Sequence, residues 1–349
     1  MNIAAGTNPH RVYAQELRRR LPAHYFRPVG YRALWMIPYI AVASGGILLV
    51  TMTTLPVALR FAIALVIGMS FASLGFLGHE IMHGAVTRRP WLRDLLGGIC
   101  LLPHAVAPLL WRQWHNAEHH GNTQIHGRDP DATSTIEDYQ ERRSVQILHR
   151  LVPIRSIRFF LLLSVWLNVH AAIVLRNHLR AASGRGRLRL IIQSLLPLVF
   201  WAAVTVLLGW RHLPLFYVVP LLVSNFVLMS YIATNHHLNP LLEDDDPLKG
   251  SLTLIVPRFL DVFHSNFSHH TEHHIFPAMS TKYAPEVKRL LKKLWPDRYN
   301  EMSLSDAMKS LWATPRLYLD NIRLVDPATG QAYPVVGHGL NPKQIAPVE

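Results

Sequence analysis

Apolar residues along the chain collect in four runs that are long enough to cross a bilayer. A membrane-spanning helix needs about 20 mostly apolar residues. The runs cover 33–55, 61–78, 190–210 and 214–234. Short turns separate the first two runs and the last two, so each pair is expected to form a helical hairpin.

Composition agrees with a membrane protein. Half of the residues are hydrophobic and 16% are charged, whereas a soluble domain carries about 25% charged residues. The net charge is +13, but the basic residues flank the apolar runs, as in cytoplasmic loops of membrane proteins. No nucleic-acid motif accompanies them, so a nucleic-acid partner is not expected.

Cys100 is the single cysteine, which excludes an internal disulfide and a thiolate metal cluster. Any bound metal must therefore be held by histidine or carboxylate. The first 30 residues lack the apolar segment of a secretory signal.

Twelve of the 21 histidines fall in four short groups. The first contains His79 and His83, and the third contains His236 and His237, each at the end of an apolar run. The second group is His115, His119 and His120. The fourth group is His264, His269, His270, His273 and His274.

The spacing within these groups suits metal binding. Residues at i, i+3 and i+4 share one face of a helix, so His79 with His83, and His115 with His119, should present their rings together. The same holds for His270 with His273 and His274. Neutral imidazole ligates Fe, Zn, Cu and Ni. One tetrahedral zinc needs four ligands, and the surplus favours two ions of a metal that accepts more ligands, such as iron.

A second interpretation of the first group is a zinc metalloprotease. Residues 79–83 match H-E-x-x-H, in which the glutamate is a general base. That interpretation leaves the other groups unexplained. Glu80 is better interpreted as an acceptor that orients an imidazole N–H. A histidine-rich transporter is disfavoured because the groups lie at the ends of the runs and not at mid-bilayer depth.

Two further apolar stretches are interrupted. Residues 95–110 contain glycines and prolines and are expected to be re-entrant or interfacial. Residues 159–175 include Asn168 and His170. A crossing there would put the second and fourth histidine groups on opposite sides of the membrane, so we expect this stretch to lie along the interface.

The fold expected from these patterns is all-α and integral to the membrane, with four transmembrane helices in two hairpins and a cytosolic helical cap that carries the histidines. Residues 1–32 are expected to be a cytosolic segment, 33–279 the membrane domain with the metal site, and 280–349 a cytosolic helix and tail. Residues 180–189 are interpreted as a basic linker, 282–299 as a surface helix, and the tail after Asp326 as loosely structured. Most Lys and Arg lie away from the hairpin turns, which places the histidine side in the cytosol.

The boxes H-x-x-x-H, H-x-x-x-H-H and H-x-x-H-H around two hairpins resemble the membrane fatty acid desaturase family over about residues 34–279. Supporting motifs are Trp111–Arg112, Gly127–Pro130 and Ile275–Pro277. The spacing is most similar to that of acyl-lipid-type bacterial desaturases.

The resemblance implies a centre of two iron ions. Its ligands would be His79, His83, His115, His119, His120, His236, His270, His273 and His274. His237 is the reserve for His236, and Asn266 stands where related sequences place an asparagine near the metals.

The activity implied is O2-dependent insertion of a double bond into a fatty acyl chain carried on lipid, CoA or carrier protein. Trp111 and Trp114 are candidate walls of the acyl channel. A ferredoxin- or cytochrome-type donor must be external, because no His-Pro-Gly-Gly motif of a fused cytochrome b5 is present. The implied location is a bacterial inner membrane. Related hydroxylases, ketolases, acetylenases and decarboxylases share the scaffold, and the motifs do not distinguish them.

Overall fold

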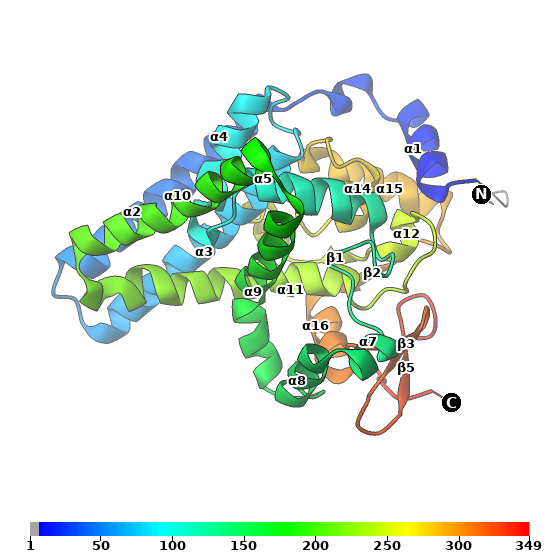
Figure 1. The fold of residues 1–349 in the computed structure, drawn as a ribbon. Helices are drawn as coiled ribbons and strands as arrows, with labels where there is room; N and C mark the ends of the chain where they lie inside the picture. The colour runs from blue at the N-terminus through cyan, green and yellow to red at the C-terminus, as the bar shows by residue number, and fades with distance from the viewer. Residues whose placement is uncertain (1–6, 349) are drawn as a thin grey trace.

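A computed structural model describes residues 7–348, and its most prominent feature is an elongated lobe of long apolar helices (Figure 1). α3 packs along both α2 and α11. α10 joins them through Trp201, whose ring centre lies 5.8 Å from that of Phe71 and 4.3 Å from that of Tyr217. The lobe consists of α2 (Met36–Met52), α3 (Val57–Met82), α10 (Gly184–Leu208) and α11 (Val219–His236).

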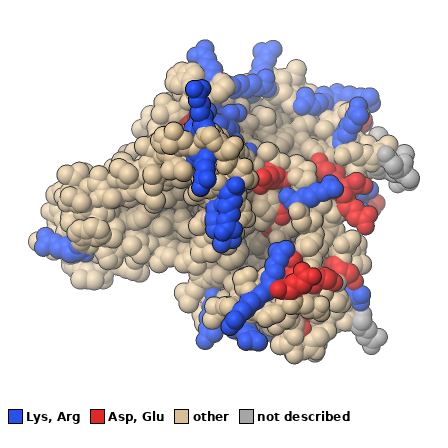
Figure 2. Space-filling model, in the orientation of Figure 1, with Lys and Arg blue, Asp and Glu red and all other residues tan. Residues whose placement is uncertain are grey.

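The far end of the lobe carries two turns that a single arginine joins. Residues 53–56 connect α2 to α3, and 209–213 connect α10 to η6 (Pro214–Val218), which leads into α11. Arg60 donates to the carbonyl of Val50 at 2.8 Å and lies 2.9 Å from Nδ1 of His212. Figure 2 shows the outer part of the lobe almost free of charged side chains except at this tip. Such a surface suits the hydrocarbon of a bilayer.

Within residues 7–348, five helices are long and apolar enough to cross a membrane, one more than the four expected. The fifth is α9 (Arg158–Ala181), which is longer than the predicted 159–175 stretch. Figure 1 shows α9 running across the lobe helices and not along them. Its exposed side carries an apolar residue at every fourth position, Leu161, Val165, Val169 and Ile173, and Ile157 just before the helix continues this stripe.

The predicted linker at 180–189 is also different in the structure. α10 begins at Gly184, so most of the linker is the first turn and a half of a helix. The arginines there remain exposed. Arginine is a good helix former, and basic composition by itself does not mark a linker.

The stretch at 95–110 lies within a broken helix. α4 (Pro90–Leu101) and η3 (Leu102–His104) are followed, after a bend of 100°, by α5 (Pro108–Trp111) and η4 (Arg112–His119). Ala105 at the bend has a left-handed φ of 55°. Gly97 lets α4 approach α3, because a Cβ there would collide with the side chain of Met82.

The remaining elements form a cap at the other end of the lobe (Figure 1). α15 corresponds to the surface helix expected at 282–299. Its buried Val287 and Leu291 join Tyr13 and Leu17 of α1 in one apolar cluster. The cap helices are α1 (Pro9–Arg20), α6 (His120–Asn122), α7 (Ile136–Glu141), α8 (Arg143–Leu151), α12 (Pro247–Gly250), α13 (Arg258–Phe263), α14 (His270–Ile275), α15 (Ala284–Leu294) and α16 (Leu304–Ala313). The 3-10 helices are η1 (Ala23–Phe26), η2 (Gly30–Trp35), which leads into α2, and η7 (Thr281–Tyr283), while η5 (Trp210–His212) lies in the turn at the far end of the lobe.

The fold is mostly helical, but the all-α expectation needs a correction because the cap contains two small sheets. β1 (Thr253–Ile255) pairs in parallel with β2 (Glu301–Ser303). β3 (Tyr318–Asp320), β4 (Arg323–Val325) and β5 (Ala332–Pro334) form an antiparallel sheet in that order. Strands of three residues are too short to show an alternating pattern in sequence.

The tail after Asp326 is likewise ordered and not loose. β5 pairs with β4, with Tyr333 opposite Leu324. Tyr333 and Val335 are buried with Tyr318 and Leu241 in one apolar cluster. The tail therefore packs onto the cap next to the loop that follows α11.

Candidate metal centre

The nine histidines expected as ligands converge where the lobe meets the cap. α3 and α11 end there and bring His79, His83 and His236. η4 and α6 bring the second histidine group, and α14 brings the last three rings. Seven of the nine are buried, while His83 and His120 are half-buried. Segments far apart in sequence thus meet in one place.

The nine rings sort into two groups whose candidate ligand atoms all lie within 4.8 Å of one another. We call them the five-ring group and the four-ring group. The five-ring group is His79, His83, His115, His120 and His273. The four-ring group is His119, His236, His270 and His274. An overlapping set of His115, His119 and Asp131 meets the same distance limit.

The two groups are neighbours. His119 and His120 are consecutive residues, yet they point into different groups. The ring of His120 stacks on that of His274, with centres 4.2 Å apart. Two metal ions held by these groups would therefore be close to one another.

The wide turns of η4 explain why the second box is divided. η4 is a π-helix, in which residues five apart lie nearly above one another. His115 therefore meets His120, with 3.3 Å between their Nε2 atoms. The rings of His115 and His119 still lie together, as their spacing predicted, with centres 5.1 Å apart, but His119 belongs to the four-ring group. α-Helical spacing does hold for His79 with His83 and for His270 with His274.

In the five-ring group, aromatic side chains surround the histidines. The Nε2 atoms of His273 and His120 lie 3.2 Å apart. The His79 ring is 4.9 Å from Phe267, and the His115 ring is 4.6 Å from Trp111. Among the described residues, no carboxylate, carbonyl or hydroxyl group hydrogen-bonds to any of these five rings.

In the four-ring group, polar partners hold the outer nitrogens of three rings, whereas Nδ1 of His270 has none among the described residues. Nδ1 of His119 lies 3.0 Å from Asp129, Nδ1 of His236 lies 3.1 Å from the carbonyl of Gly250, and Nδ1 of His274 lies 3.2 Å from Oγ1 of Thr123. Each contact leaves Nε2 free to face the group. The Nε2 of His270 lies 2.7 Å from that of His236 and 3.1 Å from that of His274.

Several of the imidazole nitrogens are buried without a hydrogen-bond partner in the described part of the chain. They include both nitrogens of His79 and one each of His83, His120, His270 and His273. Buried polar atoms are normally satisfied, and nitrogens crowded at 2.7–3.3 Å are a suitable donor set for a metal. The two groups therefore fit a metal site.

Burial keeps the α14 histidines uncharged. It lowers the pKa of His273 to about 3, with a further contribution from His119. Burial and then the neighbouring His236 lower the pKa values of His270 and His274 well below the ordinary value. Metal binding requires this neutral form.

Glu80 does not orient an imidazole as the sequence analysis expected. Its carboxylate instead forms an ion pair with Arg32 at 2.6 Å and accepts hydrogen bonds from Oγ of Ser280 and the amide of Thr281. One residue after His79, its side chain points to a different side of α3. This pairing also argues against a metalloprotease, because the carboxylate is occupied away from the clustered rings.

The other two candidate supporting residues also lie outside the groups. Asn266 has a left-handed φ of 56° and donates from Nδ2 to the carbonyl of Thr281 at 3.1 Å, so it closes the loop before α14. His237 belongs to neither group and lines the adjacent cavity. The spacing of residues in the sequence did not indicate that these two side chains would lie outside the groups.

Three supporting residues were not identified from the sequence. Asp129 and Asp131 approach His119, and Thr123 contacts His274. Asp129 was noted as part of Gly127–Pro130 but was given no role. A carboxylate ten residues after a box histidine was the available signal, since histidine ligands usually donate to such groups.

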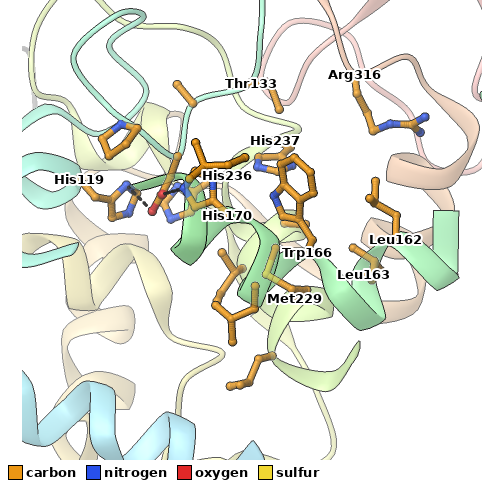
Figure 3. Close-up of a pocket in the computed structure, with 18 of the residues that line it drawn as sticks. His119, Thr133, Leu162, Leu163, Trp166, His170, Met229, His236, His237 and Arg316 are labelled. Atoms are coloured by element: carbon orange, nitrogen blue, oxygen red, sulfur yellow. Dashed lines mark hydrogen bonds and ion pairs between the residues drawn. The ribbon is translucent and has the colours of Figure 1, made fainter. Parts of the chain in front are cut away.

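A cavity of about 590 Å³ runs beside both groups. Its walls are mostly apolar and come from α3, α8, α9 and α11 (Figure 3). Trp111 and Trp114, expected as channel walls, both line it. Trp114 is fixed by donating to Asp131 at 2.6 Å. The volume lies in the range of small-molecule sites.

Comparison with known proteins gives a consistent result. The family model for fatty acid desaturases matches residues 56–305, which include all nine histidines. The chain is 25% identical over 312 residues to the sn-1 acyl-lipid omega-3 desaturase (ferredoxin) of Nostoc sp. (strain 36), covering 85% of each chain. The enzyme of that name from Synechocystis sp. is 28% identical over 323 residues, covering 86% of each. The sn-1 oleoyl-lipid 12-desaturase of Synechocystis sp. is 23% identical over 310 residues, covering 83% of this chain and 85% of that protein.

Proposed function

The chain belongs to the fatty acid desaturase family, and from this membership we propose that it desaturates an acyl chain lying in the cavity beside the two histidine groups. The observation that carries the proposal is that one cavity extends along both histidine groups. It has apolar walls and is lined by rings from both groups, among them His79 and His236. A long methylene chain placed there would pass directly beside the metal centre.

We assign one iron ion to each histidine group. Imidazole suits iron, and the nine rings exceed what one ion requires. The bound iron pair would supply the O2-dependent oxidation of an unactivated methylene. Overall, two neighbouring carbons lose one hydrogen each, and O2 takes up these two hydrogens, two external electrons and two protons to form two waters.

The contribution of the chain itself is to hold the acyl group in place and exclude water. Trp111 and Trp114 form rigid walls next to the rings, and Phe76 and Leu228 continue the apolar lining beyond them. Restricting the chain to one path favours reaction at one pair of carbons. Asp129, Thr123 and the Gly250 carbonyl fix ring orientation in the four-ring group.

For the substrate and the electron source, the relatives suggest a specific assignment. Those from Nostoc and Synechocystis are named for acyl-lipid substrates and ferredoxin. We therefore propose an acyl chain esterified to a membrane lipid as substrate and a ferredoxin-type protein as donor.

We further propose that the lobe spans a bacterial inner membrane and that the cap faces the cytosol. The distribution of charge supports this orientation, because the tip has few charged residues while the cap carries most of them (Figure 2). α9 would lie at the interface, its exposed apolar stripe against lipid. In this arrangement four helices cross the membrane as two hairpins. All nine rings then lie on the same side of the membrane.

The decisive experiment is expression in a bacterial host that lacks this activity, together with a ferredoxin and its reductase. Fatty acids released from the lipids are then analysed by mass spectrometry, with derivatisation that locates double bonds. We expect new unsaturated chains two mass units lighter than their precursors, and none with His273→Ala. Hydroxylated or shortened chains would contradict desaturation and favour a related oxidation.

A further inference from the structure

One arginine at the end of the cavity has no carboxylate partner. Arg316 lines the cavity just after α16. It donates from Nη2 to the carbonyl of Val152, and its guanidinium carbon lies 5.5 Å from the ring centre of Phe159. Its Nη1 is buried and has no hydrogen-bond partner. Within residues 7–348, no Asp or Glu lies at ion-pair distance from it.

Three other poorly exposed arginines each have a carboxylate partner. Arg32 meets Glu80 at 2.6 Å, Arg298 meets Asp246 at 2.6 Å, and Arg112 pairs with Asp94. A buried charge without a counter-ion is unfavourable. Burial lowers the pKa of Arg316 to about 10, which still leaves it charged at neutral pH. An anion from outside the chain would supply the missing partner.

The position of Arg316 relates this charge to the metal centre. Figure 3 shows Arg316 at one end of the cavity and His119 and His236 toward the other. Leu162, Leu163 and Trp166 lie between them. A ligand that filled this space would have an anionic end and a long apolar body.

The neighbours of Arg316 do not neutralise it. His149 also lines this end, and burial and then the charge of Arg316 lower its pKa to about 4. The charge of Asp326 opposes this shift of His149, but Asp326 is not at ion-pair distance from Arg316. Arg142 adds a second cation, but its side chain is 64% exposed and meets Asp138 at 3.1 Å. Arg316 therefore remains the uncompensated charge at this end.

We propose that Arg316 binds the anionic group that adjoins the acyl chain of the substrate, a phosphate or a carboxylate. Guanidinium matches both groups with paired hydrogen bonds. The inference rests on the proposed function, because it places the head of the substrate at Arg316 and the methylenes beside the histidines. Fixing the head in this way determines which carbons reach the metals, so Arg316 would be a specificity-determining residue.

The test measures binding and does not require turnover. Purified protein in nanodiscs of a neutral lipid is titrated with three probes that carry a 9,10-dibromostearoyl chain: the free fatty acid, the lysophosphatidic acid and the monoacylglycerol. Bromine quenches nearby tryptophan, and Trp166, Trp111 and Trp114 line the cavity. We expect wild type to bind one or both anionic probes about tenfold more tightly than the neutral probe.

Variants separate charge recognition from structure. Arg316→Gln should remove the preference for the anionic probes, whereas Arg316→Lys should keep part of it. The matched control is Arg150→Gln, because Arg150 is exposed on α8 and does not line the cavity. This control should keep the full preference.

Each outcome distinguishes a source or overturns the inference. Tighter binding of lysophosphatidic acid identifies a phospholipid head group. Tighter binding of the free acid identifies a carboxylate and contradicts an esterified substrate. Equal binding of all three probes by wild type, or an undiminished preference in Arg316→Gln, would refute the role of Arg316. Failure of desaturation in the lipid analysis would leave these binding results unchanged, so the two proposals can fail separately.

Discussion

The two histidine groups have the same kind of ligand but opposite surroundings. In the four-ring group, Asp129, Thr123 and the Gly250 carbonyl each hold an outer nitrogen. In the five-ring group, Trp111 and Phe267 pack against the rings, and no polar partner among the described residues holds them. Hydrogen bonds orient three of the four rings in one group, whereas packing orients the rings of the other.

This difference has a chemical consequence. A carboxylate that accepts an imidazole N–H fixes the tautomer and raises the basicity of the ligating nitrogen. His119 receives this assistance, whereas His79 has both nitrogens without a partner. Ring positions in the five-ring group should therefore depend more on the metal itself. The two metal positions are expected to be chemically distinct.

The largest effect is expected from removing one ligand of either group. His273→Ala opens the five-ring group and His236→Ala opens the four-ring group. Each variant should lose at least about 100-fold in turnover, since loss of a ligand exceeds loss of a supporting contact. Turnover is measured in membranes with ferredoxin and O2. Metal analysis should show that each variant loses mainly one of the two ions.

The control for these variants is His126→Ala, because His126 lies outside both groups and pairs with Asp138 at 2.8 Å. It should retain near-normal turnover. Normal turnover in His273→Ala or His236→Ala would remove that residue from the ligand set.

An intermediate effect is expected from Asp129→Asn. The change removes the carboxylate that holds His119 and should weaken metal binding or activity roughly 10- to 100-fold. Metal content of the four-ring group should fall first during dialysis against a chelator. Asp138→Asn is the matched control, since that carboxylate holds a histidine outside the groups. Equal losses in both variants would mean that Asp129 acts only on folding.

The smallest effect is expected from Thr123→Val. It removes the hydroxyl that contacts Nδ1 of His274 and donates to the carbonyl of His119. The contact with His274 contributes about 1 kcal/mol, or about fivefold in turnover. Thr123→Ser keeps the hydroxyl and should behave like wild type. An effect of Thr123→Val as large as that of His236→Ala would show that hydrogen bonds and ligands are not separable in this group.

The long apolar runs made the helices of the lobe predictable. Short elements that have no periodic pattern of apolar residues could not be predicted. The runs at 33–55 and 214–234 correspond closely to helical spans, because their apolar length directly reflects a bilayer. The length of α9 was underestimated because Asn168 interrupts its apolar sequence. In the structure Asn168 donates to the carbonyl of His104 at 2.7 Å, so its side chain is satisfied. The three-residue strands depend on tertiary pairing and leave no signal in the sequence.

In the metal centre, the sequence identified the rings but not how they divide. All nine expected histidines converge. Their spacing in the sequence had already indicated metal binding. The division into five and four depends on the π-helical turn of η4, which spacing alone does not reveal. The partner of Glu80 was also unpredictable, because Arg32 lies 48 residues earlier and meets it only through folding.

Whether each histidine group holds one iron ion can be measured by metal analysis. Purified chain, expressed with iron and isolated without chelators, is measured by inductively coupled plasma mass spectrometry against protein concentration from amino-acid analysis. We expect about two irons per chain in wild type and about one in His273→Ala and in His236→Ala. A single zinc per chain in the active wild-type protein would contradict this expectation.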